Sequence, residues 1–202
     1  MASALPKRAW GWGKARIYAV GHSTRTADEM VALLEAHDVR VLADIRTVPR
    51  SRTNPQFNVD TFGKTLARVD IHHQHLARLG GLRRPLKDSP NSAWRNLSFR
   101  GYADYMQTED FARGLEELRV LSREGPVAIM CAEALRWRCH RSLVADALWA
   151  RGVEVLHLTS ATRAEPHRLT AFAEVHGTQV LYPGSSDAPR LTRPDADLAA
   201  PA

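Results

Sequence analysis

The chain has 202 residues, of which 44% are hydrophobic and 25% charged, a composition typical of a single globular domain. No apolar stretch approaches the roughly 18 residues needed to cross a bilayer, and the first residues lack the apolar core of a signal peptide. We therefore expect a cytoplasmic protein with no membrane partner. The net charge of +6 favours a phosphate-bearing partner, such as a nucleotide or nucleic acid, although an arginine-rich composition can equally reflect a GC-rich genome.

The ends of the chain differ in composition from its middle. Residues 1–14 are basic and show no period, which predicts a flexible basic arm. Residues 184–202 are small, polar and proline-rich, which predicts a disordered tail. The folded part is then a single domain at residues 15–183.

Within this domain, short apolar runs alternate with amphipathic helical patterns. Strands are expected at 16–23, 39–46, the start of 70–81, 126–133, 153–160 and 178–183, and helices at 26–38, 58–69, 98–106, 108–125, 139–152 and 167–177. Strands of nearly continuous Val, Ile and Leu that alternate with helices indicate a parallel sheet covered on both faces. We therefore expect a single-domain α/β fold that is doubly wound around a mostly parallel sheet, with helices on both faces.

Candidate binding or catalytic residues follow four of the expected strands. They are Gly21, His22 and Ser23 after the first strand, Arg46, Arg50 and Arg52 after the second, His75 and the Gly80-Gly81-Leu82 run after the third, and Cys131, Glu133, Cys139, His140 and Arg141 after the fourth. Because parallel strands end at the same edge of a sheet, and ligands bind there, we expect these groups to form one site.

The first group suits an anion. Gly21 allows close backbone approach, and Ser23 together with the free N–H groups of the next helix can hold a phosphate, with His22 beside them. The alternative is that Ser or Thr only caps that helix.

The arginines suit the same kind of ligand. Arg46, Arg50, Arg52 and Arg141 each present a planar fork that matches phosphate, so we expect them to bind substrate or another anion. The alternative is a solvated basic loop. For Asp44, at the end of the second strand, we expect a structural ion pair with Arg46 or Arg141.

Both cysteines of the chain lie in the stretch Ile129–Leu148. Two cysteines in a cytoplasmic protein indicate free, catalytic or metal-binding thiols more than a structural disulfide. Cys131 ends a strand, and Cys139 opens a helix between Arg138 and Arg141, which predicts a lowered pKa and a partly ionised thiol at Cys139. One interpretation is a nucleophile, with His140 or Glu133 as the proton-transfer partner.

Two other interpretations of the thiols remain open. Cys131, Cys139 and His140, with His75 as a further candidate, could bind a divalent metal, although seven residues between the cysteines exceed the spacing of common zinc sites. His73 and His75 share one strand face but lack a third ligand on that segment. Alternatively, the cysteines only pack in the core.

Several motifs in order resemble one protein family, DUF488. They are YAVGHSTR, LADIRTVPRSR followed by NPQF, a histidine shortly before LGGLR, and CAE followed by CHR at a helix start. The resemblance spans about residues 17–182 and implies a compact α/β fold without an established reaction. The residues that carry it are Gly21, His22, Ser23, Arg46, Pro49, Arg50, Ser51, Phe57, His75, Leu79, Gly80, Gly81, Cys131, Glu133, Cys139, His140 and Arg141.

Our first hypothesis is an enzyme that acts on a phosphate-bearing substrate, a nucleotide or nucleic acid. The arginines would hold the anion, Glu133 would be the acid or base, and Cys131, Cys139 and His140 would supply thiol or metal chemistry. The first alternative is a non-catalytic nucleotide- or nucleic-acid-binding module. The second is a thiol redox sensor in which the two cysteines form a reversible disulfide.

Overall fold

The computed structural model describes residues 11–184. Most of the predicted arm and nearly all of the predicted tail therefore lie outside the described residues. The last part of the arm is described, and it does not point freely into solvent there: Trp12 is only 6% exposed and packs in the hydrophobic core.

The elements follow the predicted alternation as far as Ser160 and depart from it after that residue. They are β1 (Ile17–Gly21), α1 (Ala27–Glu35), β2 (Val41–Asp44), the 3-10 turn η1 (Pro55–Phe57), α2 (Val59–Ala67), β3 (His72–His75), η2 (Ala77–Leu79), α3 (Leu97–Tyr105), α4 (Glu109–Leu121), β4 (Val127–Cys131), η3 (Arg136–Arg138), α5 (Arg141–Ala150), β5 (Val155–Ser160), β6 (Arg163–Pro166), β7 (Glu174–His176) and β8 (Gln179–Leu181).

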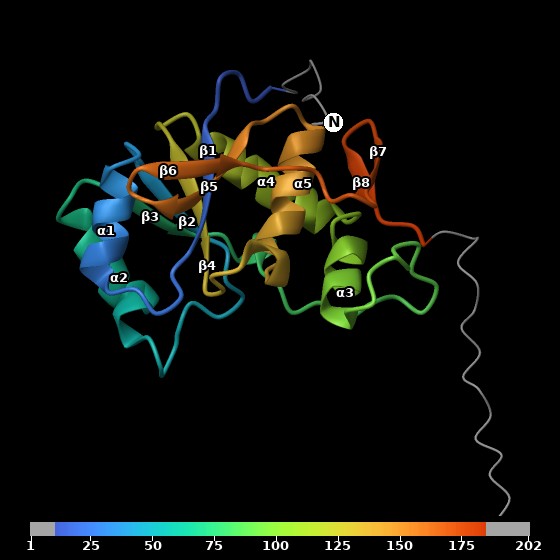
Figure 1. Ribbon diagram of the computed structural model, residues 1–202, viewed down its shortest axis with the longest axis horizontal. Helices are drawn as coiled ribbons and strands as arrows, with labels where there is room; N and C mark the ends of the chain where they lie inside the picture. The colour runs from blue at the N-terminus through green and yellow to red at the C-terminus, as the bar shows by residue number, and fades with distance from the viewer. Residues whose placement is uncertain (1–10, 185–202) are drawn as a thin grey trace, which may run out of the picture.

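The central sheet has six strands in the order β3-β2-β4-β1-β5-β6, and β7 and β8 form a separate hairpin. The first five strands of this order are parallel, and β6 pairs antiparallel to β5 at the edge. Figure 1 shows α1 and α2 on one face of the sheet and α3, α4 and α5 on the other. The predicted fold class, a doubly wound and mostly parallel α/β domain, is confirmed.

The alternation of side chains along each strand creates two separate cores. On β4, Ile129 packs with α3, α4 and α5, whereas Ala128 and Met130 pack with α1 and α2. Because successive strand residues point to opposite faces, Cys131 faces the same side as Ile129, toward α5. This parity brings the thiol that ends β4 to the helix that begins after the second cysteine.

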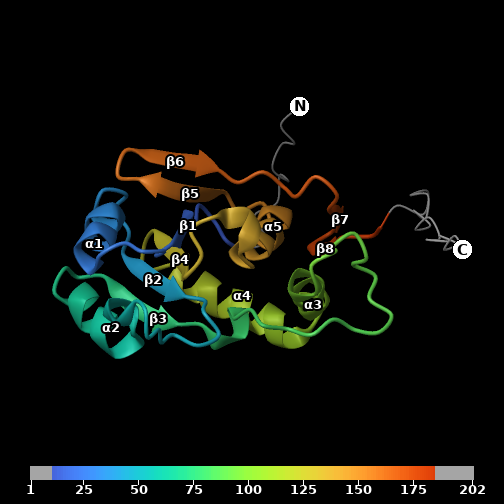
Figure 2. The same ribbon diagram turned by 60° about the horizontal axis from the view of Figure 1, so that its bottom comes forward.

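The helix predicted at residues 167–177 is wrong. The segment is instead a loop followed by β7, and its partner β8 pairs with β7 rather than with the main sheet. The reason is the buried carboxylate of Asp146 on α5, which accepts hydrogen bonds from His167 Nε2 at 2.8 Å and from both the backbone N–H and the hydroxyl of Thr170. These tertiary bonds outweigh the helical pattern of the segment. Figure 2 shows β7 and β8 beside α5 and α3, away from β6.

Candidate metal centre

The carboxyl ends of β1, β2, β3 and β4 lie at one edge of the sheet, because these strands are all parallel. A pocket of about 340 Å³ opens at this edge. Loops that follow β2, η2 and β4, together with α3, line it: Arg46, Thr47, Val48, Gly81, Leu82, Ser98, Phe99, Tyr102, Cys131, Ala132, Glu133, Arg138, Cys139 and His140.

Two sulfurs and one imidazole nitrogen meet at the wall of this pocket. The Nδ1 atom of His140 lies 3.8 Å from Cys131 Sγ and 3.9 Å from Cys139 Sγ. The three donor atoms all lie within 4.8 Å of one another. Both cysteines are buried and neither forms a disulfide. The chain thus brings together three of the residues that the sequence singles out for thiol or metal chemistry.

The orientation of His140 is fixed by its other ring nitrogen. Nε2 lies 2.9 Å from the carbonyl oxygen of Ile45. A carbonyl only accepts hydrogen bonds, so Nε2 carries the proton and, in the neutral ring, Nδ1 presents its lone pair to the sulfurs. Gly81 preserves the space beside this nitrogen, because a Cβ at that position would lie 2.9 Å from Nδ1.

The two thiols titrate in opposite directions. The neighbouring Cys139 thiol lowers the pKa of Cys131 well below its ordinary value, against the effect of burial. The neighbouring Cys131 sulfur, together with burial, raises the pKa of Cys139, so the lowered pKa predicted for this thiol at the helix start is wrong.

The geometry of these three groups fits a tetrahedral metal ion. With metal–sulfur bonds of about 2.3 Å and metal–nitrogen bonds of about 2.0 Å, a sulfur and a nitrogen ligand of a tetrahedral ion lie about 3.5 Å apart. The two observed Sγ–Nδ1 distances, 3.8 and 3.9 Å, are close to this value and nearly equal. The hydrogen bond from Nε2 to a backbone carbonyl is also the usual support of a metal-binding histidine.

The loop between the two cysteines is held by Arg141 from the first turn of α5. Its guanidinium donates to the backbone carbonyls of Glu133 and Ala134, the latter at 2.7 Å, and the residue is 3% exposed. Gly21 at the end of β1 makes room for this contact, because a Cβ there would lie 1.9 Å from the carbonyl oxygen of Glu133. Arg141 and Gly21, both predicted to bind an anion, thus contact the loop that carries Cys131.

Arg46 is engaged in a buried ion pair. Its Nη2 lies 2.6 Å from Asp44 Oδ2 and donates to the Phe57 carbonyl, and its Nε also donates to Asp44. Nη1 lies 3.4 Å from Nε2 of His22, which stacks on the ring of Phe57. The sequence-based expectation of a structural Asp44–Arg46 pair is met, and the guanidinium is largely saturated by protein atoms.

A comparison with protein families gives a match in the middle of the chain. The model of the family described as "Domain of unknown function DUF488" matches residues 26–148. The chain belongs to the DUF488 family. The match runs from the start of α1 into α5 and so includes Cys131, Cys139 and His140. A search of curated proteins and a search of solved structures each found no significant match.

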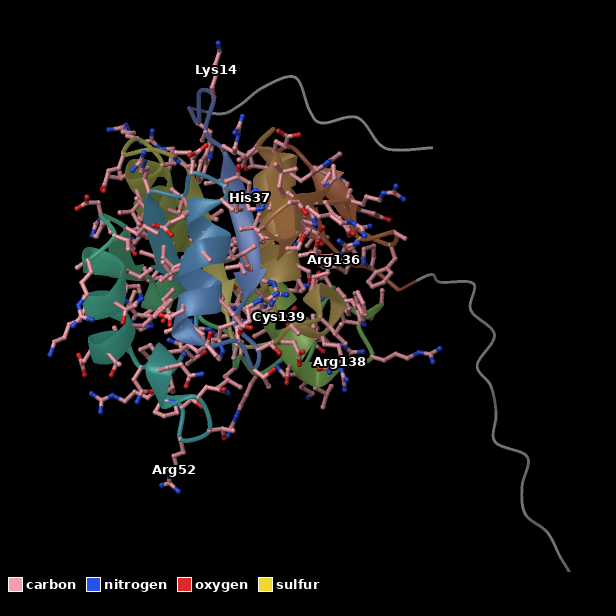
Figure 3. All side chains as sticks on the ribbon, turned by 60° about the vertical axis from the view of Figure 1, so that its left-hand side comes forward. Lys14, His37, Arg52, Arg136, Arg138 and Cys139 are labelled. Carbon is pink, nitrogen blue, oxygen red and sulfur yellow. The ribbon has the colours of Figure 1, made fainter. Side chains whose placement is uncertain are left out.

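Other residues singled out by the sequence lie apart from the cluster of this DUF488 domain. Arg50 is exposed and pairs with exposed Asp60, and Figure 3 shows Arg52 at the tip of its loop, far from Cys139. His75 turns its Nε2 to the carbonyl of Arg46 at 2.8 Å and is not among the three converging donors. Its candidacy as a ligand gains no support from this position.

Ser23 does not cap the first helix of the domain. The N-cap of α1 is Thr26, whose hydroxyl accepts from the Glu29 backbone N–H while the Glu29 carboxylate accepts from the Thr26 N–H. Ser23 instead follows Gly21 and His22 in a turn and has a φ of +50°. Its predicted role in anion binding remains a prediction.

Part of the pocket of the DUF488 domain comes from residues that we did not predict. Ser98, Phe99 and Tyr102 belong to α3, which does not directly follow a strand, so the rule that collects residues at strand ends cannot find them. Thr47, Val48, Leu82 and Arg138, in contrast, lie in the segments after the predicted strands, where the sequence places the site. No helix among residues 11–184 has the length and apolar character that a membrane span requires.

Proposed function

We propose that this DUF488 domain is a metal-dependent enzyme that acts on a phosphate-bearing substrate in the pocket. Cys131, Cys139 and His140 would hold one divalent ion, for which zinc is the best match to two sulfurs and an imidazole. The observation that carries the proposal is the placement of one nitrogen lone pair at nearly equal distances from two sulfurs.

A thiol nucleophile explains this arrangement less well. A nucleophile and its base need one direct hydrogen bond, and that scheme does not require the base to lie equally far from a second sulfur. A common central ion accounts for all three donors at once.

Three protein ligands leave a tetrahedral ion with one open position, which is the arrangement of catalytic rather than structural zinc sites. When bound, such an ion supplies a water of lowered pKa or polarises a substrate oxygen. Because Cys131, Cys139 and His140 all line the pocket, the open position would lie where substrate enters. Hydrolysis is therefore the reaction class that we favour.

The surroundings of the cluster favour an anionic substrate. Arg138 lies at the pocket with its side chain exposed, and among the described residues it has no ion-pair partner. The first turn of α5 lies directly behind Cys139, and a helix N-terminus stabilises negative charge. In this scheme Arg138 holds a phosphate of a nucleotide or nucleic acid.

Glu133 is the acid or base in the proposed reaction. It lines the pocket, is partly exposed, and is held by a hydrogen bond from the Leu135 backbone N–H to its Oε1 at 3.2 Å. A carboxylate beside the open coordination position can take a proton from the attacking water or give one to the leaving group.

Three variants of zinc-loaded protein test this function. Nucleoside monophosphates and short oligonucleotides serve as substrates, with hydrolysis followed by chromatography and binding by calorimetry. Glu133→Gln should lower turnover at least 100-fold with unchanged affinity, and Arg138→Ala should weaken binding about tenfold. Arg52→Ala, a matched change on a distant loop, should alter neither.

Two results would contradict the proposed function. If Arg138→Ala and Arg52→Ala bind phosphate compounds equally, the pocket is not the substrate site. If the protein binds the phosphate compounds tightly but hydrolyses none of them, with or without zinc, the domain is a binding module and not an enzyme.

A further inference from the structure

Leu82, on the rim of the pocket, combines an unfavourable backbone conformation with an exposed apolar side chain. Its φ is +57°, in the left-handed region where a Cβ clashes with the following carbonyl and where glycine is preferred. Its side chain is also 79% exposed, so little burial of apolar surface offsets that strain. Strained residues of this kind concentrate at functional sites.

The chain on either side of Leu82 is firmly held. The Tyr102 hydroxyl donates to the carbonyl of Leu79 at 2.8 Å, and the Thr47 hydroxyl donates to the carbonyl of Gly81 at 2.9 Å. On the other side, the backbone of Arg83 packs so closely on α3 that a Cβ at Gly101 would lie 2.4 Å from its carbonyl oxygen. The leucine side chain is therefore presented at a fixed place on the rim.

A second apolar side chain on the rim, Val48, is also largely exposed. Val48, in the loop after β2, is 60% exposed and lines the same pocket as Leu82. Deeper in the pocket the wall includes Phe99, whose ring stacks on that of Trp94 at a centroid distance of 4.8 Å, and the buried ring of Tyr102. The pocket thus combines an apolar wall and rim with donor atoms and Arg138 at the cysteine side.

We propose that Leu82 and Val48 contact the base of a nucleotide whose phosphate lies at Arg138 and the metal cluster. This inference rests on the proposed function and names the part of the substrate that decides specificity. A flat heterocycle suits an apolar wall and two aliphatic rim residues, and the volume of about 340 Å³ is at the lower end of small-molecule sites, which span about 300–1,000 Å³. A single nucleotide matches that size better than a larger cofactor.

The test compares ligands with and without a base. Binding of the four ribonucleoside monophosphates and of ribose 5-phosphate to the zinc-loaded full chain is measured by calorimetry. Wild-type protein should bind at least one of the nucleotides ten or more times more tightly than ribose 5-phosphate. Leu82→Gly should remove most of this preference and leave the affinity for ribose 5-phosphate unchanged.

Leu82→Gly is informative because it should not harm the fold. Glycine accepts a φ of +57° without strain, so Tm should stay the same or rise. Leu86→Gly is the matched control, since Leu86 is 63% exposed but does not line the pocket, and it should leave the preference for nucleotides intact.

The outcomes separate the two proposals. If ribose 5-phosphate and the nucleotides bind equally well, or if Leu82→Gly weakens all of them equally, the inference about the base is overturned while the phosphate site stands. If none of the five compounds binds the wild-type protein, the proposed function fails and the inference fails with it.

Discussion

Replacing Asp44 by Asn should lower the free energy of unfolding by about 3–5 kcal/mol, because the change leaves the Arg46 guanidinium buried without a counter-ion. Asp44 is fully buried and Arg46 is 5% exposed, so water cannot take over the role of the carboxylate. Urea denaturation followed by circular dichroism measures the effect. Asp60→Asn is the matched control: its pair with Arg50 is exposed on both sides and should contribute less than about 1 kcal/mol.

The ion pair between Asp44 and Arg46 should also make the stability of the fold depend on pH. Burial acts to raise the pKa of Asp44, but the hydrogen bonds from Arg46 outweigh it and lower the pKa to about 2. A carboxylate with a depressed pKa stabilises the fold above its unfolded pKa of about 3.9, and this contribution is lost as the pH falls toward 2. Between pH 5 and pH 2 the wild type should therefore lose about 2 kcal/mol more than Asp44→Asn. Parallel pH profiles, or a cost of Asp44→Asn below 1 kcal/mol, would contradict a structural role for the pair.

The second large effect is expected at Gly21. An alanine Cβ there would lie 1.9 Å from the carbonyl oxygen of Glu133 and 2.8 Å from its carbon, and both are backbone atoms that cannot rotate away. Gly21→Ala should therefore push the loop after Cys131 away from β1, lower the free energy of unfolding by about 3 kcal/mol and disrupt the metal cluster. Thermal denaturation together with the zinc content of the purified variant measures both effects.

Gly63→Ala serves as the control for this change. Gly63 lies inside α2, where alanine is the better helix former, and its Cβ would meet only the side chain of His73 at 3.1 Å. Its stability should stay within about 1 kcal/mol of the wild type. If Gly21→Ala is tolerated equally well and keeps its zinc, the close approach of the Glu133 carbonyl to β1 is not required for the site.

The sheet and the edge where the site lies were predictable from the sequence. Apolar runs alternating with helices predict that β1 to β4 are parallel, though not their order in the sheet, and the parity of β4 places Cys131 on the face of Ile129. Because Cys139 and His140 open the next helix, which must return over that face, their approach to Cys131 follows from local pattern and handedness.

Apart from the Asp44–Arg46 pair, the partners of the arginines and histidines could not be predicted in this way. The sequence does not indicate that the Arg46 guanidinium also reaches a buried acceptor on a turn eleven residues away, the Phe57 carbonyl. His75 is placed at the correct edge by its strand, but its ring turns to a backbone carbonyl. Sequence position fixes the edge of a sheet on which a residue lies, and tertiary hydrogen bonds decide where its side chain points.

Tertiary contacts also explain why α3 lines the pocket and why residues 167–177 do not form the predicted helix. α3 reaches the pocket only because Gly101 lets the chain after Leu82 pack against it, a contact between segments that carry no shared pattern. Residues 167–177 do not form a helix because the carboxylate of Asp146, on another helix, binds His167 and Thr170.

The metal content of the purified protein tests the central claim most directly. The protein should be prepared without a His-tag and without oxygen, and measured by mass spectrometry beside Cys139→Ser, His140→Ala and the control His75→Ala. We expect about one zinc per chain in the wild type and in His75→Ala, and a loss of at least tenfold in affinity in the other two variants, with folding checked by circular dichroism. A wild-type protein that is folded, has reduced thiols and binds no metal even when zinc is added would contradict the claim, as would full occupancy in His140→Ala.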